Sequence, residues 1–227
     1  MKLRWILLIS LCTLAACGRP PEPATVGEAD FKGFGCIRCH RVGNEGGTYG
    51  PDLTLVGFRK SKDWLNVWLK NPHAWKPTTV MPNFHLPDQV RQDLIEYLSQ
   101  QQGQAWGDTR PWDAPELQGD LVQKGEVIFN RAGCVACHGL RGAGGYPNNN
   151  VQGGKINTLT LVADGYSKDE LKDRIHKGKI SDPADPTQPK PMIFMPPWGQ
   201  KLKDSDIDAL VEFLYSLRPK PAAKDTW

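Results

Sequence analysis

The segment Cys134-Val135-Ala136-Cys137-His138 contains two cysteines three residues apart and a histidine directly after the second cysteine. This CxxCH pattern is typical of covalent attachment of a c-type haem. Two thiols about one helical turn apart can each bond a vinyl-derived carbon on one edge of the macrocycle, and the next imidazole then reaches the iron as its proximal ligand. The motif occurs a second time, as Cys36-Ile37-Arg38-Cys39-His40. The sequence therefore predicts two covalently bound haem c groups.

A zinc site or a pair of disulfides would be other uses for these cysteines. The two cysteine pairs could in principle meet at one four-thiolate zinc. They lie far apart in the chain, however, and zinc would leave His40 and His138 without a role. The repeated CxxCH pattern favours haem attachment over both alternatives.

The N-terminus predicts export. Lys2 and Arg4 form a short positive region, and Trp5 to Leu14 form an apolar run that is too short to span a bilayer. Residues 1–16 are therefore interpreted as a signal peptide. The expected location is outside the cytoplasmic membrane, where c-type haem is attached.

The end of this signal, Leu14-Ala15-Ala16-Cys17-Gly18, resembles the lipobox of bacterial lipoproteins. In that family cleavage falls before the cysteine, which becomes the acylated first residue. Ordinary cleavage after Ala16 would leave Cys17 incidental, but a single cysteine at the cleavage point of an exported protein favours lipidation. The resemblance implies a lipid anchor at Cys17, in a membrane facing the periplasm or the cell exterior.

Charge and hydropathy limit the classes of partner. The formal net charge is +3, and removal of Lys2 and Arg4 leaves +1, so nucleic acid is not an expected partner. No other stretch approaches the length of a transmembrane helix, and membrane association would therefore depend on the lipid at Cys17. The chain has 23 glycines and 19 prolines, which predicts many loops.

Two segments of the chain carry the same order of signals. Each has a CxxCH motif, a glycine-rich loop, a middle helix, a methionine followed by proline, and a terminal helix. The middle helices are predicted to begin at Ser61 and Ser167, and Ser167 with Glu170 fits a capping box. The terminal helices, 86–98 and 202–214, align without a gap and have apolar residues at helical spacing.

This repeat predicts a mainly α-helical protein made of two domains in tandem. The expected organisation is a signal peptide (1–16), a lipidated tether (17–28), a first domain (29–102), a linker (103–118), a second domain (119–218) and a flexible tail (219–227).

The order of helix, CxxCH, loop, helix, Met-Pro and helix resembles class I cytochrome c, and it covers nearly the whole mature chain twice. The resemblance implies that each domain has a few helices wrapped around a covalent haem. It also implies four axial iron ligands: His40 and Met81 for the first haem, His138 and Met195 for the second. Met192 is a rival for Met195, and His73 and His85 are rivals for Met81, but only Met81 and Met195 precede the repeated proline.

One position distinguishes the two halves. The segment Gly50-Pro51-Asp52-Leu53 looks like the family loop in which the proline carbonyl accepts a hydrogen bond from the proximal histidine. The second half has no such proline at Gly154-Lys155-Ile156-Asn157, and Pro147 is the only proline nearby. The hydrogen-bond partner of the His138 imidazole is therefore left open.

With histidine and methionine on opposite sides, each iron would lack an open coordination position and would pass single electrons. The resemblance thus implies a lipid-anchored dihaem electron carrier that is not itself an enzyme and has no small-molecule substrate. Its expected partners are redox proteins, such as a quinol-oxidising complex or a terminal oxidase. The alternative is a dihaem peroxidase-like enzyme, which needs one open or displaceable ligand.

Overall fold

The computed structural model describes residues 22–219. The predicted signal peptide, the predicted lipidation site Cys17 and residues 220–227 of the predicted tail lie outside the described residues. Between residues 22 and 219, no helix is both long and apolar enough to cross a membrane.

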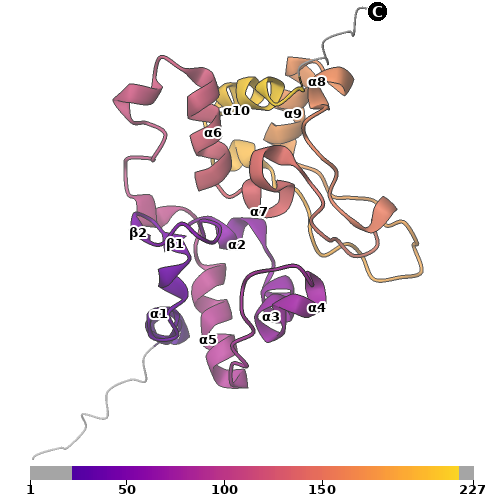
Figure 1. Cartoon of the computed structure of the whole chain (residues 1–227). Helices are drawn as coiled ribbons and strands as arrows, with labels where there is room; N and C mark the ends of the chain where they lie inside the picture. Colours follow the sequence, from indigo (N-terminus) through magenta and orange to yellow (C-terminus); the bar gives the residue numbers. More distant parts are fainter. Residues whose placement is uncertain (1–21, 220–227) are drawn as a thin grey trace, which may run out of the picture.

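The chain forms two helical halves that lie one above the other in Figure 1. The elements of the first half are α1 (Pro23–Gly33), η1 (Cys36–Arg38), β1 (Arg41–Val42), β2 (Glu45–Gly46), α2 (Val56–Arg59), α3 (Lys62–Lys70), α4 (Pro72–Trp75) and α5 (Asp88–Ser99). The only sheet in the described part of the chain is the antiparallel pair of β1 and β2.

The second half repeats this order without the strand pair. Two short 3₁₀ helices, η2 (Gln104–Trp106) and η3 (Pro115–Leu117), connect the halves. The later elements are α6 (Leu121–Arg131), α7 (Val135–His138), η4 (Leu140–Gly142), η5 (Gln152–Gly154), α8 (Val162–Gly165), α9 (Lys168–Lys177), η6 (Trp198–Gln200) and α10 (Asp204–Ser216). The predicted mainly α-helical class with two tandem domains is confirmed.

The serines predicted to begin the two middle helices are the N-caps of those helices. Ser61 caps α3 by accepting a hydrogen bond from the backbone N–H of Trp64 at 3.2 Å. Ser167 and Glu170 form the predicted capping box at the start of α9. Each cap satisfies backbone N–H groups that a helix start leaves without partners.

Two segments differ in detail from the expected organisation. Helix α1 begins at Pro23, so residues 23–28 of the expected tether are helical. The segment 103–118 is not a loose connector, because Trp106 and Trp112 are buried in it, with ring centroids 5.1 Å apart. Both rings belong to the core of the second half.

The first and last helices of each half cross at a glycine. A Cβ on Gly27 of α1 would overlap the carbonyl oxygen of Asp93 in α5, and a Cβ on Gly125 of α6 would overlap that of Ala209 in α10. Aromatic pairs flank both crossings, Phe31 with Tyr97 and Phe129 with Phe213. Glycine is therefore required at each crossing for the helix backbones to approach this closely.

The two halves also share their cores. Leu55 of the first half is buried in the hydrophobic cluster of the second, and Ile193 of the second half is buried in the cluster of the first. Phe58 and Trp198 meet edge to face across the boundary, with ring centroids 5.3 Å apart. Burial of apolar side chains across this boundary stabilises one arrangement of the halves.

We predict that Gly125→Ala lowers the free energy of unfolding of the full chain by about 1–3 kcal/mol, because the added methyl group forces α6 and α10 apart. Alanine is the better helix former by about 1 kcal/mol, so a net loss would show that the clash outweighs propensity. Denaturant unfolding measures the change. Gly33→Ala is the matched control, because Gly33 also lies in a helix and a Cβ there meets nothing within 4 Å. Equal stability of the two variants would contradict the close crossing.

Candidate haem-binding sites

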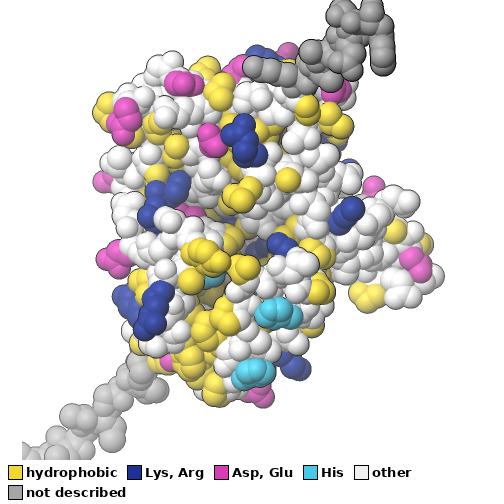
Figure 2. Space-filling view, viewed as in Figure 1, with side chains coloured by type: hydrophobic (Ala, Val, Ile, Leu, Met, Phe, Trp, Pro, Cys, Tyr) yellow, Lys and Arg dark blue, Asp and Glu magenta, His cyan; other side chains and the backbone are white. Residues whose placement is uncertain are grey.

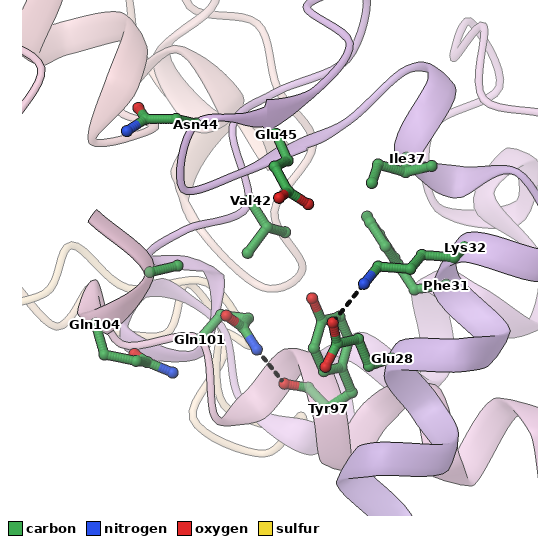
Figure 3. Close-up of a pocket in the computed structure, with 11 residues that line it drawn as sticks. Glu28, Phe31, Lys32, Ile37, Val42, Asn44, Glu45, Tyr97, Gln101 and Gln104 are labelled. Carbon is green, nitrogen blue, oxygen red and sulfur yellow. Dashed lines mark hydrogen bonds and ion pairs between the residues drawn. The ribbon is translucent and has the colours of Figure 1, made fainter. Parts of the chain in front are cut away.

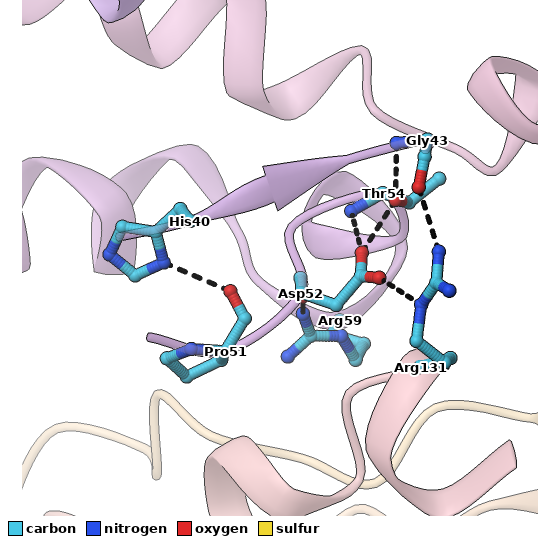
Figure 4. A network of polar contacts seen from close by, with 7 residues as sticks. All are labelled: His40, Gly43, Pro51, Asp52, Thr54, Arg59 and Arg131. Carbon is cyan, nitrogen blue, oxygen red and sulfur yellow. Dashed lines mark hydrogen bonds and ion pairs between the residues drawn. The ribbon is translucent and has the colours of Figure 1, made fainter. Parts of the chain in front are cut away.

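The first motif positions its histidine through the loop that follows it. The Nδ1 atom of His40 lies 2.9 Å from the carbonyl oxygen of Pro51, and a carbonyl can only accept, so Nδ1 carries the proton (Figure 4). The ring packs directly on Gly50, where a Cβ would lie 2.5 Å from its Cε1 atom. This contact fixes the imidazole and leaves Nε2 with the lone pair that an iron ligand needs.

A buried polar network holds this loop in place. The carboxylate of Asp52 accepts hydrogen bonds from the backbone N–H of Thr54 at 2.8 Å and from Nε of Arg131 at 2.7 Å (Figure 4). Arg131 belongs to α6, and it also donates to the carbonyl oxygen of Gly43 at 2.7 Å. The loop beside the first histidine is therefore tied to the second half of the chain by a paired, buried charge.

Met81 packs against the same hydrophobic cluster as Cys36 and Ile37 of the first motif. Met81 and Cys36 are both partly buried and pack against the hydrophobic cluster around Phe31 and Trp64. The indole Nε1 of Trp68 donates a hydrogen bond to the Met81 sulfur at 3.0 Å. The rival ligands His73 and His85 are both exposed.

The second motif lines a cavity of about 650 Å³. Cys134, Cys137, His138 and Met195 all face this one space, which therefore brings the predicted residues of the second site together. Apolar side chains supply much of the remaining wall, among them Phe129, Leu159, Leu171, Ile175, Trp198 and Leu210. Met192, the rival of Met195, does not line the cavity and packs against the cluster of the first half.

Burial keeps both motif histidines and the Cys134 thiol uncharged. It lowers the pKa of His138 to about 4 and raises the pKa of the Cys134 thiol to about 12. The pKa of His40 is also lowered, mainly by burial. Both imidazoles are therefore neutral near pH 7, which is the form that binds a metal.

The histidines differ in their hydrogen bonds. Among the described residues, the buried Nδ1 atom of His138 has no partner. The carbonyl oxygen of the nearby Pro147 instead accepts the indole N–H of Trp75 at 3.2 Å. The lack of a second Gly-Pro loop in the sequence signalled this difference.

Two cations of the first half lie against the second motif. The guanidinium of Arg59 packs on Gly133, where a Cβ would lie 2.5 Å from its Cζ atom, and Nζ of Lys60 lies 3.5 Å from the sulfur of Cys137. Figure 2 shows a hollow between the halves in which lysine or arginine side chains are recessed. Sequence reasoning missed both residues, because nothing in a repeat pattern tells how the repeats dock.

The zinc and disulfide alternatives find no support in this geometry. Cys36, Cys39, Cys134 and Cys137 are all free thiols. Among residues 22–219, no group of three or more histidine, cysteine, aspartate or glutamate side chains could hold a metal ion. The cavity around Cys134 and Cys137 instead suits a large, mostly apolar group attached to both thiols and held by a neutral imidazole.

Another pocket is lined by residues of α1, α5, η2 and the β1–β2 pair (Figure 3). Its volume is about 440 Å³, and the ion pair of Glu28 and Lys32, at 2.6 Å, lies in its wall. None of the predicted iron ligands or haem-bearing cysteines lines it, so it is separate from both candidate sites.

Known proteins resemble parts of this chain. A subunit 2 of cytochrome c oxidase from Alkalihalophilus pseudofirmus is 34% identical over 86 residues, which cover 33% of this chain and 25% of the relative. A nitric oxide reductase subunit from Stutzerimonas stutzeri is 30% identical over 83 residues, which cover 34% of this chain and 57% of the relative. The matches thus span about a quarter and somewhat more than half of these relatives. No solved structure matches the chain.

A family model gives the broader assignment. The model described as cytochrome c matches twice, over residues 25–102 and 122–218, and the two matches together take in both CxxCH motifs and both Met-Pro pairs. The matched stretches coincide with the two helical halves. The chain therefore belongs to the cytochrome c family.

Proposed function

We propose that the chain is a dihaem electron-transfer protein, with one haem c bound covalently at Cys36 and Cys39 and another at Cys134 and Cys137. The observation that supports it most is the convergence of His138, Met195 and the second cysteine pair on one cavity. The family assignment and the repeated motif extend the same reasoning to His40 and Met81.

The haem supplies the chemistry, because its iron takes up and releases a single electron. The residues of the chain would restrict the haem to electron transfer. Each cysteine pair would hold the macrocycle covalently, and the neutral imidazoles of His40 and His138 would bind the iron. The sulfurs of Met81 and Met195 would occupy the coordination position that oxygen or peroxide would need, and they would favour the reduced state. The apolar side chains that line the cavity beside His138 would pack against the macrocycle.

We further propose that the protein is exported and anchored by lipid at Cys17, in a membrane facing the periplasm or the cell exterior. The sequence around Cys17 supports this part, and the absence of a spanning helix between residues 22 and 219 is compatible with it. The partners would be redox proteins of a respiratory membrane, such as a quinol-oxidising complex or a terminal oxidase. Both relatives are named as subunits of oxidoreductases, one an oxidase and the other a reductase. Docking to such partners would be transient.

The peroxidase-like alternative requires an iron with a free position. Met195 lines the cavity of the second motif, and Met81 packs against the same hydrophobic cluster as Cys36 of the first, which argues against this alternative.

The spectrum of the purified protein tests the function directly. We expect two haems per chain by mass spectrometry, a weak red methionine–iron band in the oxidised form, and no change when carbon monoxide is added to the reduced form. Binding of carbon monoxide at either haem would contradict the closed sites and favour the enzyme alternative.

Met195→Ala is predicted to open the second iron. The variant should lose about half of the red band and bind carbon monoxide at one haem, because the side chain that closes the position is gone. Met192→Ala is the matched control, since Met192 lies outside the cavity. If Met192→Ala opens an iron and Met195→Ala does not, the ligand assignment is wrong.

Cys17→Ser is predicted to release the protein from the membrane fraction while its haem content stays the same, because lipidation needs the thiol. Fractionation of cells followed by haem staining measures both quantities. Retention of the variant in the membrane fraction would contradict a lipid anchor at this residue.

A further inference from the structure

Lys60 is a buried cation at the edge of the second haem site. Its side chain belongs to the first half, and the residue is 5% exposed. Its Nζ atom lies 3.5 Å from the sulfur of Cys137 and 4.1 Å from the centre of the Trp64 ring. The face of Tyr146 lies 5.5 Å away on another side. Burial lowers the pKa of Lys60, and the aromatic faces act against this shift by stabilising the ammonium form.

In the part of the chain that the structure describes, no carboxylate forms an ion pair with this lysine. Among the described residues, neither Lys60 nor its neighbour Arg59 forms a salt bridge, whereas the buried Asp52 nearby is paired with Arg131 at 2.7 Å. Arg59 lies between the sites, since it donates to the carbonyl oxygen of Asp52 at 2.8 Å and packs on Gly133. Lys60 is the cation that touches a haem-bearing cysteine of the second motif.

The proximal histidines add a second, independent difference. His40 donates from Nδ1 to the carbonyl oxygen of Pro51, whereas Nδ1 of His138 has no acceptor among the described residues. An acceptor at Nδ1 makes the imidazole a stronger electron donor, which stabilises oxidised iron. Among the described residues, His40 has this acceptor and His138 does not, so only the first site would gain this stabilisation of the oxidised state.

The charge of Lys60 and the absence of an acceptor for His138 among the described residues would both raise the reduction potential of the second site. A fixed positive charge close to a haem opposes the extra positive charge of the oxidised iron, and so it favours the reduced state. A weaker imidazole donor also favours the reduced state. In a buried setting the charge is poorly screened by salt, in contrast to a lysine at the surface.

We propose that the second haem has the higher reduction potential of the two, and that Lys60 of the first half raises it. A single electron entering the protein then comes to rest at the second site, and internal transfer runs from the first site to the second. This order rests on the proposed dihaem electron-transfer function. The docking of the halves would then affect redox behaviour, because the first half supplies the charge that raises the reduction potential of the haem in the second.

A potentiometric titration with one haem marked tests the order of potentials. The full chain should titrate in two waves, and Met195→His should move one of them strongly downward, because a second imidazole replaces the thioether at the second iron. We expect the higher wave to move. Movement of the lower wave would overturn the proposal. This step leaves Lys60 untouched, so it holds even if variants at Lys60 fold poorly.

Three lysine variants then test the role of Lys60 itself. Lys60→Met should lower the reduction potential of the second haem more than that of the first. Lys60→Arg keeps the positive charge, so it should leave both potentials close to those of the wild-type chain. Lys62→Met is the matched control, because Lys62 is two residues away, exposed and paired with Glu96 at 2.6 Å. No shift in Lys60→Met, or an equal shift in Lys62→Met, would remove Lys60 from the proposal.

The haem count separates failure of this inference from failure of the proposed function. Two haems and two waves with the opposite assignment would overturn only the order of potentials. Fewer than two haems per wild-type chain would overturn the dihaem function on which the order depends.

Discussion

The close crossing of two helices in each half is the constraint on which the rest of the structure depends. Gly27 against Asp93, and Gly125 against Ala209, bring helix backbones to a separation that no other residue allows. Each CxxCH motif follows directly from the first helix of its pair, and each Met-Pro pair precedes the second. The crossing therefore fixes the position of each CxxCH motif relative to the Met-Pro pair of the same half.

Much of this architecture could be predicted because its signals are local. The capping serines before α3 and α9, the apolar spacing of α5 and α10 and the two CxxCH motifs act over a few residues each, and the structure places all of these elements where the sequence indicated. The departure of the second half from the Gly-Pro loop was also legible, and His138 indeed lacks the contact that Pro51 gives His40.

The contacts between the halves could not be predicted, because they depend on docking. Nothing in the sequence near Ser61 indicates that Lys60 reaches Cys137, or that Arg59 packs on Gly133. The hydrogen bond from Trp68 to Met81 joins an α3 side chain to a loop 13 residues later, and helical spacing alone does not predict it. The glycines and prolines of segment 103–118 indicated a linker, whereas its tryptophans are buried in the core of the second half.

Leu55 and Ile193 are each buried in the core of the other half, which makes the two halves depend on each other. A duplicated unit begins as two independent copies, but once each copy lends a side chain to the other's interior, neither is complete alone. Cutting the chain between the repeats would leave a hole in one interior and an apolar side chain in water, each at a cost of about 1–3 kcal/mol. The two halves are thus one unit of stability, because a substitution in the core of one half also changes the stability of the other.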